Sequence, residues 1–137
     1  MRVYGILMRL RAWNIMVTLL SGLVSQFFLM TGEIVILCTC SSAEESQRIA
    51  SHLLEGHLAA CVNVLPSVRS YYWWQGAIES ADEHLLFIKS TAALFPAVQD
   101  AVRQMHSYEV PELLALPVLA GSADYLAWLR SNLRANS

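Results

Sequence analysis

Residues 34–37 read IVIL, and the run continues as CT to residue 39. A short, continuous run of apolar and mostly β-branched residues predicts a strand that is covered on at least one face and paired along both edges. Such a strand lies inside a sheet and not at its margin. We therefore expect this first strand, ending near Thr39, to organise the rest of the fold around itself.

A helix is expected directly after this strand. Ser42 and Glu45 have the spacing of a capping box, which predicts a helix that begins at Ala43. Gly56 is expected to end the helix in a left-handed conformation. The apolar residues that recur on one helix face, and are therefore expected to cover the sheet, are Ile49, Ala50, Leu53 and Leu54.

The next segment predicts one long, bent strand. Residues 58–65 have the composition of a strand, and residues 68–74 extend it. Pro66 lies between the two parts. Because proline has no N–H to donate to a sheet, it is compatible only with an edge or a bulge at this point.

A return strand follows through a tight turn at Gln75 and Gly76. Residues 77–79 begin the return, and residues 84–90 continue it with alternating side chains. The polar and small residues 80–82 are expected to break the strand. The two segments together predict a hairpin with an interruption.

The remaining chain predicts a helix, a short strand and a closing helix. The first helix begins between residues 92 and 95, with a proline tolerated in its first turn, and ends at His106. A short strand over residues 113–119 is interrupted at Pro117, and the closing helix starts at Gly121.

The order of these elements is βαββαβ with an extra C-terminal helix. Two βα crossovers around a hairpin predict an α+β, ferredoxin-like sandwich in which helices cover a single face of an antiparallel sheet. The other sheet face then needs a partner. A domain of about 105 residues with such a face is expected to form oligomers.

The N-terminal part has a different composition. Residues 1–32 carry three arginines as their only charged residues, and the 19 residues from Ala12 to Met30 have no charge and include 13 apolar side chains. As a helix they would span roughly 28 Å, close to the thickness of a bilayer core. We therefore divide the chain into a hydrophobic N-terminal segment, residues 1–32, and a folded domain, residues 33–137.

The N-terminal segment has three interpretations, and they predict different cellular locations for the protein. It is a signal peptide, although no clean cleavage motif is present, or a signal anchor that leaves the domain in the lumen. The third interpretation is that translation starts at Met30, which yields a cytoplasmic product. The first two predict a secretory or membrane-associated protein.

Charge and motifs exclude several function classes. The net charge of −2 provides no excess of positive charge for nucleic acid. No phosphate-binding glycine loop, dinucleotide fingerprint or zinc-protease motif is present, and no pattern orients a nucleophile, so an enzyme is not expected. The three cysteines, Cys38, Cys40 and Cys61, do not indicate a disulfide framework, because their number is odd and Cys38 and Cys40 lie side by side on one strand face.

Five ordered blocks of the folded domain resemble the CutA divalent-cation tolerance proteins. The blocks are LAACVN at residues 58–63, YWWQGAIE at 72–79, FIKS at 87–90, HSYEVPE at 106–112, and the pair LP at 116–117 with YLAWL at 125–129. Two departures are Ser90, where the family usually has Thr, and Ser107, where it usually has Pro. The second departure is expected to loosen its loop.

The resemblance implies a ferredoxin-like subunit in a stable homotrimer. It also implies a link to copper and other divalent ions, and hence to metal tolerance or the response to metal ions. For animal members it implies a role in the membrane anchoring or processing of acetylcholinesterase, which would make the trimer a scaffold for a membrane or secretory partner.

The resemblance also implies a metal site. Bacterial relatives place ligands at a Cys of the first strand and at a His-His pair after the second helix, which correspond here to Cys38, Met105 and His106. Thiolate, thioether and imidazole are donors that suit copper, and exchanging one imidazole for a thioether favours Cu(I). The competing interpretation makes Cys38 and Met105 ordinary packing residues.

Two further groups of residues are candidates for a role. His57 and Cys61 lie close in sequence and suggest a second site, although a cysteine in an Ala-Ala-Cys-Val context usually faces the core. An aromatic group is expected either in the core and interface or in the wall of a cleft between subunits. Its members are Tyr71, Tyr72, Trp73, Trp74, Tyr108 and Trp128.

Overall fold

The computed structural model describes residues 32–135. The predictions for the N-terminal segment concern residues that, apart from Gly32, lie outside this described part, and they stay predictions. The helices found within residues 32–135 are too short or too polar to cross a membrane. The elements are β1 (Glu33–Cys40), α2 (Ala43–Glu55), β2 (Cys61–Trp74), β3 (Ala77–Thr91), the 3₁₀ turn η1 (Ala92–Leu94), α3 (Phe95–Met105), β4 (Leu114–Pro117) and α4 (Ala123–Ser131).

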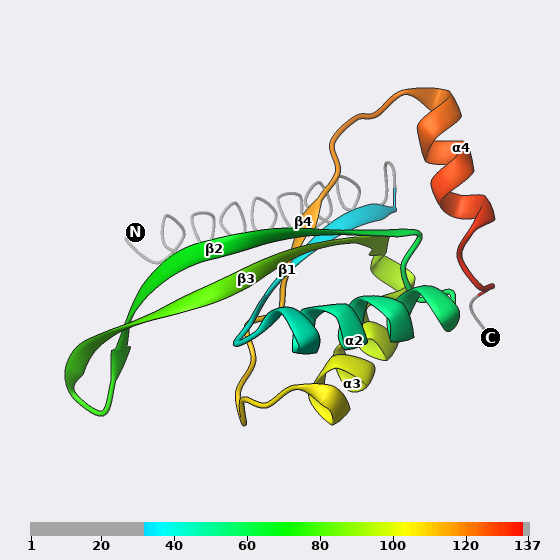
Figure 1. The fold of residues 1–137 in the computed structure, drawn as a ribbon. Coiled ribbons are helices and arrows are strands. Elements are labelled where there is room, and N and C mark those ends of the chain that lie inside the picture. The colour runs from blue at the N-terminus through cyan, green and yellow to red at the C-terminus, as the bar shows by residue number, and fades with distance from the viewer. Residues whose placement is uncertain (1–31, 136–137) are drawn as a thin grey trace, which may run out of the picture. The chain divides into compact units, whose positions relative to one another are not determined.

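The four strands form one antiparallel sheet in the order β2-β3-β1-β4. β1 pairs with β3 on one side and with β4 on the other, so the strand that begins with IVIL lies inside the sheet as predicted. Helices α2 and α3 lie next to each other on one face (Figure 1). The α+β, ferredoxin-like fold with an additional C-terminal helix is therefore confirmed.

The core lies between the sheet and these two helices. Alternate residues of β1 and β3 are fully buried there, as are the apolar stripes of α2 and α3. Ser90 lies where the family usually has Thr, and its buried hydroxyl donates a 2.6 Å hydrogen bond to the Leu58 carbonyl. The buried core side chains include Ile34, Ile36, Cys38, Cys40, Ile49, Leu53, Leu86, Ile88, Val98 and Val102.

Helix α2 begins as predicted but ends differently. The Ser42 hydroxyl accepts the Glu45 N–H at 3.1 Å, which confirms the cap. The prediction of a left-handed Gly56 is wrong, because this glycine has φ −80° and the left-handed residue is His57, with φ +52°. Two hydrogen bonds offset the steric cost at His57: its N–H donates to Leu54, and its Nδ1 pairs with the Asn132 carbonyl.

The hairpin is longer and more regular than the sequence suggested. β2 is the bent strand that was expected, with a bulge between Leu65 and Val68 and a left-handed Ser67 at φ +60°. It begins only at Cys61. The predicted break at residues 80–82 is wrong, because β3 continues through them and pairs with β2, and Arg69 donates hydrogen bonds across the strands to Asp82 and Ser80.

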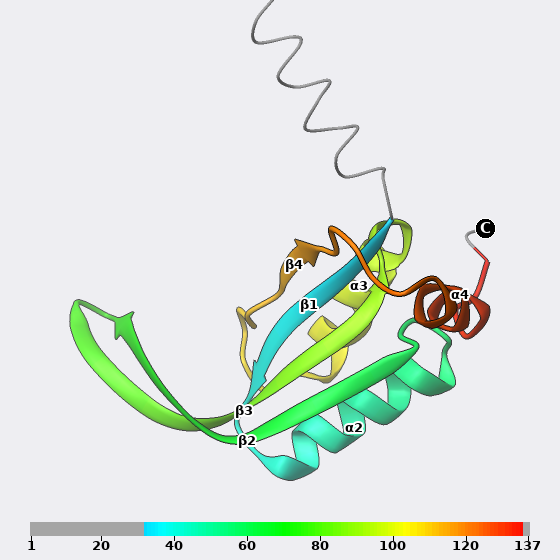
Figure 2. The same cartoon turned by 90° about the horizontal axis from the view of Figure 1, so that it is seen from above.

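The two ends of the molecule differ. The β2–β3 hairpin extends and curves beyond the rest of the sheet, and α4 lies at the opposite end (Figures 1 and 2). Arg130 of α4 donates to the buried Glu33 carboxylate of β1, which fixes the helix to the sheet. Leu133 lies beyond the end of α4 but still packs against the core.

Candidate metal centre

Two thiols lie at the end of β1. Cys38 and Cys40 are two residues apart, so the pleat of the strand directs both toward the helix-covered face. Both side chains are completely buried, and both are free thiols. The expectation that no disulfide joins them agrees with this arrangement.

His106 comes to the same place from the end of α3. It is the C-cap residue, and its imidazole is fully buried. Its Nδ1 accepts the Tyr108 N–H at 3.0 Å, and its Nε2 lies 2.7 Å from the Thr39 carbonyl oxygen. Because an amide N–H only donates and a carbonyl only accepts, the ring is the neutral tautomer with its proton on Nε2.

The ligand atoms of Cys38, Cys40 and His106 all lie within 4.8 Å of one another. Two sulfur donors and one imidazole nitrogen are a donor set for soft and borderline metal ions, among them Cu(I) and Zn²⁺. A metal-binding histidine usually donates its other ring N–H to a carbonyl, and the Thr39 hydrogen bond already has this form. The residues present therefore fit the metal that the resemblance implies.

The Cys38 thiol is protonated while only protein surrounds it. The hydrogen bond with Cys40 and burial together raise the pKa of Cys38 far above its ordinary value. A cation reverses this balance, since it stabilises thiolate directly and releases the thiol protons. Metal binding here must therefore displace protons into solvent.

Glu45 connects the end of β1 to the loop that carries His106. Its buried carboxylate accepts the backbone N–H groups of Ser41 at 2.9 Å and Ser107 at 2.5 Å, and the Ser41 hydroxyl at 2.9 Å. Burial alone would raise the pKa of Glu45, but these hydrogen bonds outweigh burial and hold it at about 2. The expectation of a loosened loop at Ser107 is wrong, because the N–H that proline lacks is one of these donors.

Tyr108 holds the other side of the same loop. Its N–H donates to His106, and its hydroxyl donates at 2.9 Å to the buried carboxylate of Glu83 on β3. Burial, followed by the contact with Glu83, raises the pKa of Tyr108 to about 12. The imidazole of His106 is therefore held by Thr39 of β1 and by Tyr108 of its own loop, and Tyr108 is in turn held by Glu83 of β3.

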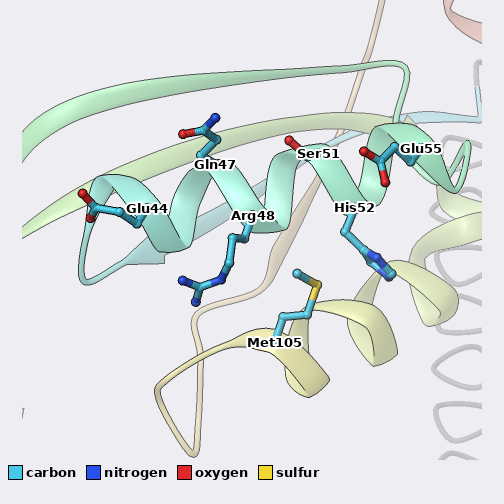
Figure 3. A pocket seen from close by; sticks show the side chains of 7 residues that line it. All are labelled: Glu44, Gln47, Arg48, Ser51, His52, Glu55 and Met105. Atoms are coloured by element: carbon cyan, nitrogen blue, oxygen red, sulfur yellow. The ribbon is translucent and has the colours of Figure 1, made fainter.

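Met105, the remaining predicted ligand, lies in a groove between α2 and α3. Figure 3 shows its thioether directed from α3 toward α2, where Arg48 and His52 also line the groove. The side chain packs against the core as well. Its role as a ligand stays a prediction.

The proposed pairing of His57 with Cys61 has no support among the described contacts. His57 is occupied by the Asn132 carbonyl, whereas the Cys61 sulfur contacts the Lys89 ammonium at 3.7 Å and the Asn63 side-chain oxygen at 3.9 Å. Cys61 is only partly buried and pairs with Lys89, whereas its neighbour Val62 pairs with the buried Ile88, so the expectation that Cys61 faces the core is also wrong.

Sequence reasoning identified Cys38 and His106 but did not include Cys40 among the ligands. The signal was present, since a Cys-x-Cys spacing on a strand places both thiols on one face. That His106 lies near this face was implied by the family resemblance and not by the strand pattern itself.

Comparisons with known proteins agree with the fold and identify the family. Residues 34–132 match the family described as CutA1 divalent ion tolerance protein. A divalent-cation tolerance protein CutA from Pectobacterium atrosepticum is 46% identical over 74% of this chain and 92% of its own length. The human protein CutA is 46% identical over 67% of this chain and 51% of its own length.

A solved structure shows the same fold. The divalent cation tolerance protein Cut A1 of Thermus thermophilus has a TM-score of 0.73 and 44% identity, over 74% of this chain and 99% of the other. These relatives are named for cation tolerance and not for an enzymatic reaction. The chain therefore belongs to the CutA1 divalent ion tolerance family, which supports a role in metal tolerance.

Proposed function

We propose that this protein binds copper as a homotrimer and acts in divalent-cation tolerance, with Cys38 and His106 as metal ligands. The observation that carries the proposal is the buried group of Cys38, Cys40 and His106, whose ligand atoms lie within 4.8 Å of one another. Sulfur donors in an apolar, buried setting favour the soft ion Cu(I).

The orientation of His106 supports the same proposal. Its Nε2–H is held by the Thr39 carbonyl, so Nδ1 carries the lone pair that can bind a metal. That lone pair now accepts the Tyr108 N–H, and a metal at Nδ1 replaces this hydrogen bond. Metal binding would therefore break this one hydrogen bond, release the thiol protons and form metal–ligand bonds.

A copper titration of the full chain tests the proposal. Cu(I) is added under reducing conditions in competition with a chelator of known affinity, and light scattering is measured on the same sample. We expect a fixed ratio of copper to subunit and a trimer. Cys38→Ser and His106→Ala should each weaken binding at least tenfold, whereas Cys61→Ser, a thiol away from this group, should leave it unchanged.

The alternative function is a trimeric scaffold for a membrane or secretory partner, in which metal binding is incidental. Copper affinity that is weak and indifferent to Cys38 and His106 would contradict the copper proposal and leave the scaffold as the hypothesis to pursue. The location of the protein stays a prediction that depends on residues 1–32. Immunofluorescence of the chain with and without residues 1–29 distinguishes a secretory from a cytoplasmic protein.

A further inference from the structure

His84 of β3 faces the same side of the sheet as the two buried thiols. In the β1–β3 register His84 lies directly opposite Cys40, as Leu86 lies opposite Cys38. Leu86, Ile88 and Ser90 follow at alternate positions and are all buried under the helices. Since side chains alternate along a strand, His84 shares their face.

The His84 ring has an unsatisfied nitrogen. Its Nδ1 is buried and has no hydrogen-bond partner among the described residues. A buried polar atom without a partner costs about 1–3 kcal/mol, and most buried polar atoms in proteins are paired. We therefore expect the Nδ1 atom of His84 to bind a partner under other conditions.

The neighbours of His84 suggest what that partner is. Directly opposed residues of an antiparallel pair have Cβ atoms about 4.5–5.5 Å apart, so a thiol and an imidazole facing each other can reach the same ion. The opposing residue is Cys40, which belongs to the group of Cys38, Cys40 and His106. His84 therefore lies next to a group of three donor atoms, one fewer than a tetrahedral metal site has.

We propose that His84 is the fourth ligand of a closed Cys₂His₂ centre formed by Cys38, Cys40, His84 and His106. The inference rests on the proposed function and adds the coordination number and the class of ion. His84 lies outside the group whose ligand atoms are within 4.8 Å of one another, so ligation by His84 requires a change of its side-chain rotamer. Four donors of this kind select an ion that accepts tetrahedral geometry, Cu(I) in reducing conditions, with Zn²⁺ as its competitor.

The closed donor set has a functional consequence. Four protein ligands leave no open position for substrate or water, which is typical of sites that hold an ion and not of sites that activate a reaction. Each ion bound displaces two thiol protons, so affinity rises with pH. The centre is therefore suited to retaining a metal ion inside the subunit.

Cobalt(II) is the probe for the geometry, because a tetrahedral ion with thiolate ligands absorbs visible light far more strongly than an octahedral one. We expect the full chain to give an intense tetrahedral spectrum with thiolate charge-transfer bands. His84→Leu should reduce the visible intensity and weaken Cu(I) binding at least tenfold. The metal-free variant should unfold at a temperature no lower than the wild type, since the substitution removes an unsatisfied buried nitrogen.

Two controls separate the donors. His52→Leu removes an exposed imidazole of α2 and should leave the cobalt spectrum unchanged. Met105→Leu keeps the volume of the side chain, removes the thioether and tests whether that group is a donor. A second measurement needs no substitution at His84. In ¹⁵N-histidine NMR of the wild type, the Nδ1 resonance of His84 should shift on binding of Zn²⁺.

The outcomes distinguish this inference from the proposed function. If His84→Leu binds copper as tightly as the wild type while Cys38→Ser does not, His84 is not a ligand and the copper proposal stands. A loss with Met105→Leu but not with His84→Leu assigns the fourth position to the thioether and overturns the inference. A wild-type chain that binds neither cobalt nor copper contradicts both.

Discussion

At the scale of single residues, Glu45 determines where His106 lies. Its carboxylate is 2% exposed and accepts three hydrogen bonds, two from Ser41 before the helix and one from Ser107 after α3. Charge-assisted hydrogen bonds of this kind are stronger than neutral ones. One side chain thus joins the end of β1 to the loop that carries the imidazole.

Replacing Glu45 should therefore destabilise the metal-free protein. Glu45→Gln keeps the size of the side chain but removes the charge and one acceptor, so we expect the free energy of unfolding to fall by about 1–3 kcal/mol at pH 7. Urea denaturation with a chelator present measures it. Glu44→Gln, an exposed neighbour in the same helical turn, is the matched control and should change stability by less than about 0.5 kcal/mol.

The same carboxylate gives a prediction about pH. The folded pKa of Glu45, about 2, lies below its ordinary value of 4.5, so the charged form stabilises the fold by up to about 3 kcal/mol above pH 4.5. This contribution is lost as pH falls from 4.5 toward 2. In Glu45→Gln that part of the acid dependence should be missing, and an acid-denaturation curve identical to the wild type would contradict the assignment.

The candidate site was only partly predictable from the sequence, and the reason differs from residue to residue. Cys38 and His106 were found through the family resemblance, and Cys40 had a local signal in its two-residue spacing. His84 had no signal, because its relation to Cys40 depends on the register of β1 against β3. Register is a property of the folded sheet and is not contained in either strand alone.

At the scale of elements, the turn between β2 and β3 depends on backbone conformation. Gln75 and Gly76 have φ +48° and +83°, so both central residues are left-handed, as in a type I′ turn. Glycine adopts this conformation without cost, and glutamine does not. No atom lies within 4 Å of a Cβ built on Gly76, so only the backbone constrains a substitution there.

Gly76→Ala should destabilise the hairpin by about 1 kcal/mol, because alanine is strained at this φ even in open space. Gln75→Asn should have the opposite sign and stabilise by a few tenths of a kcal/mol, since asparagine tolerates the left-handed region. Thermal unfolding of the two variants beside the wild type measures the difference. Equal melting temperatures for both would show that the turn does not limit stability.

Local signals explain which elements could be predicted. The start of α2, the tight turn and the bulge near Pro66 depend on neighbouring residues, and the structure confirms them. The continuity of β3 through residues 80–82 comes instead from pairing with β2. Small and polar residue types alone predict a break there, because they carry no information about this pairing. The same holds for His57, whose left-handed conformation is supported by Asn132, far along the chain.

At the scale of the whole molecule, the hairpin exposes several large apolar side chains. Trp73 and Ile78 are directly paired and are 73% and 66% exposed, Tyr71 lies on the same strand face, and Trp74 is exposed on the opposite face. The interpretation of these aromatic residues as core is therefore wrong for the isolated subunit. Exposed apolar side chains that are grouped in this way mark an interaction site, and we expect the subunits of the proposed homotrimer to meet there.

Exchanging this exposed pair should weaken the trimer without unfolding the subunit. In the double variant Trp73→Thr with Ile78→Thr, threonine keeps a high strand propensity but removes most of the apolar area. Burying each large side chain contributes about 1.5–3 kcal/mol, so we expect trimer affinity to fall at least about a hundredfold. Light scattering across a concentration series should then show smaller species at micromolar protein, while circular dichroism keeps the native spectrum.

Val110→Thr, at an apolar residue that is 84% exposed and far from the hairpin in sequence, is the control and should leave the trimer intact. A wild-type chain that scatters as a monomer at the same concentration would contradict the trimer, and a double variant that stays trimeric would move the interface away from the hairpin.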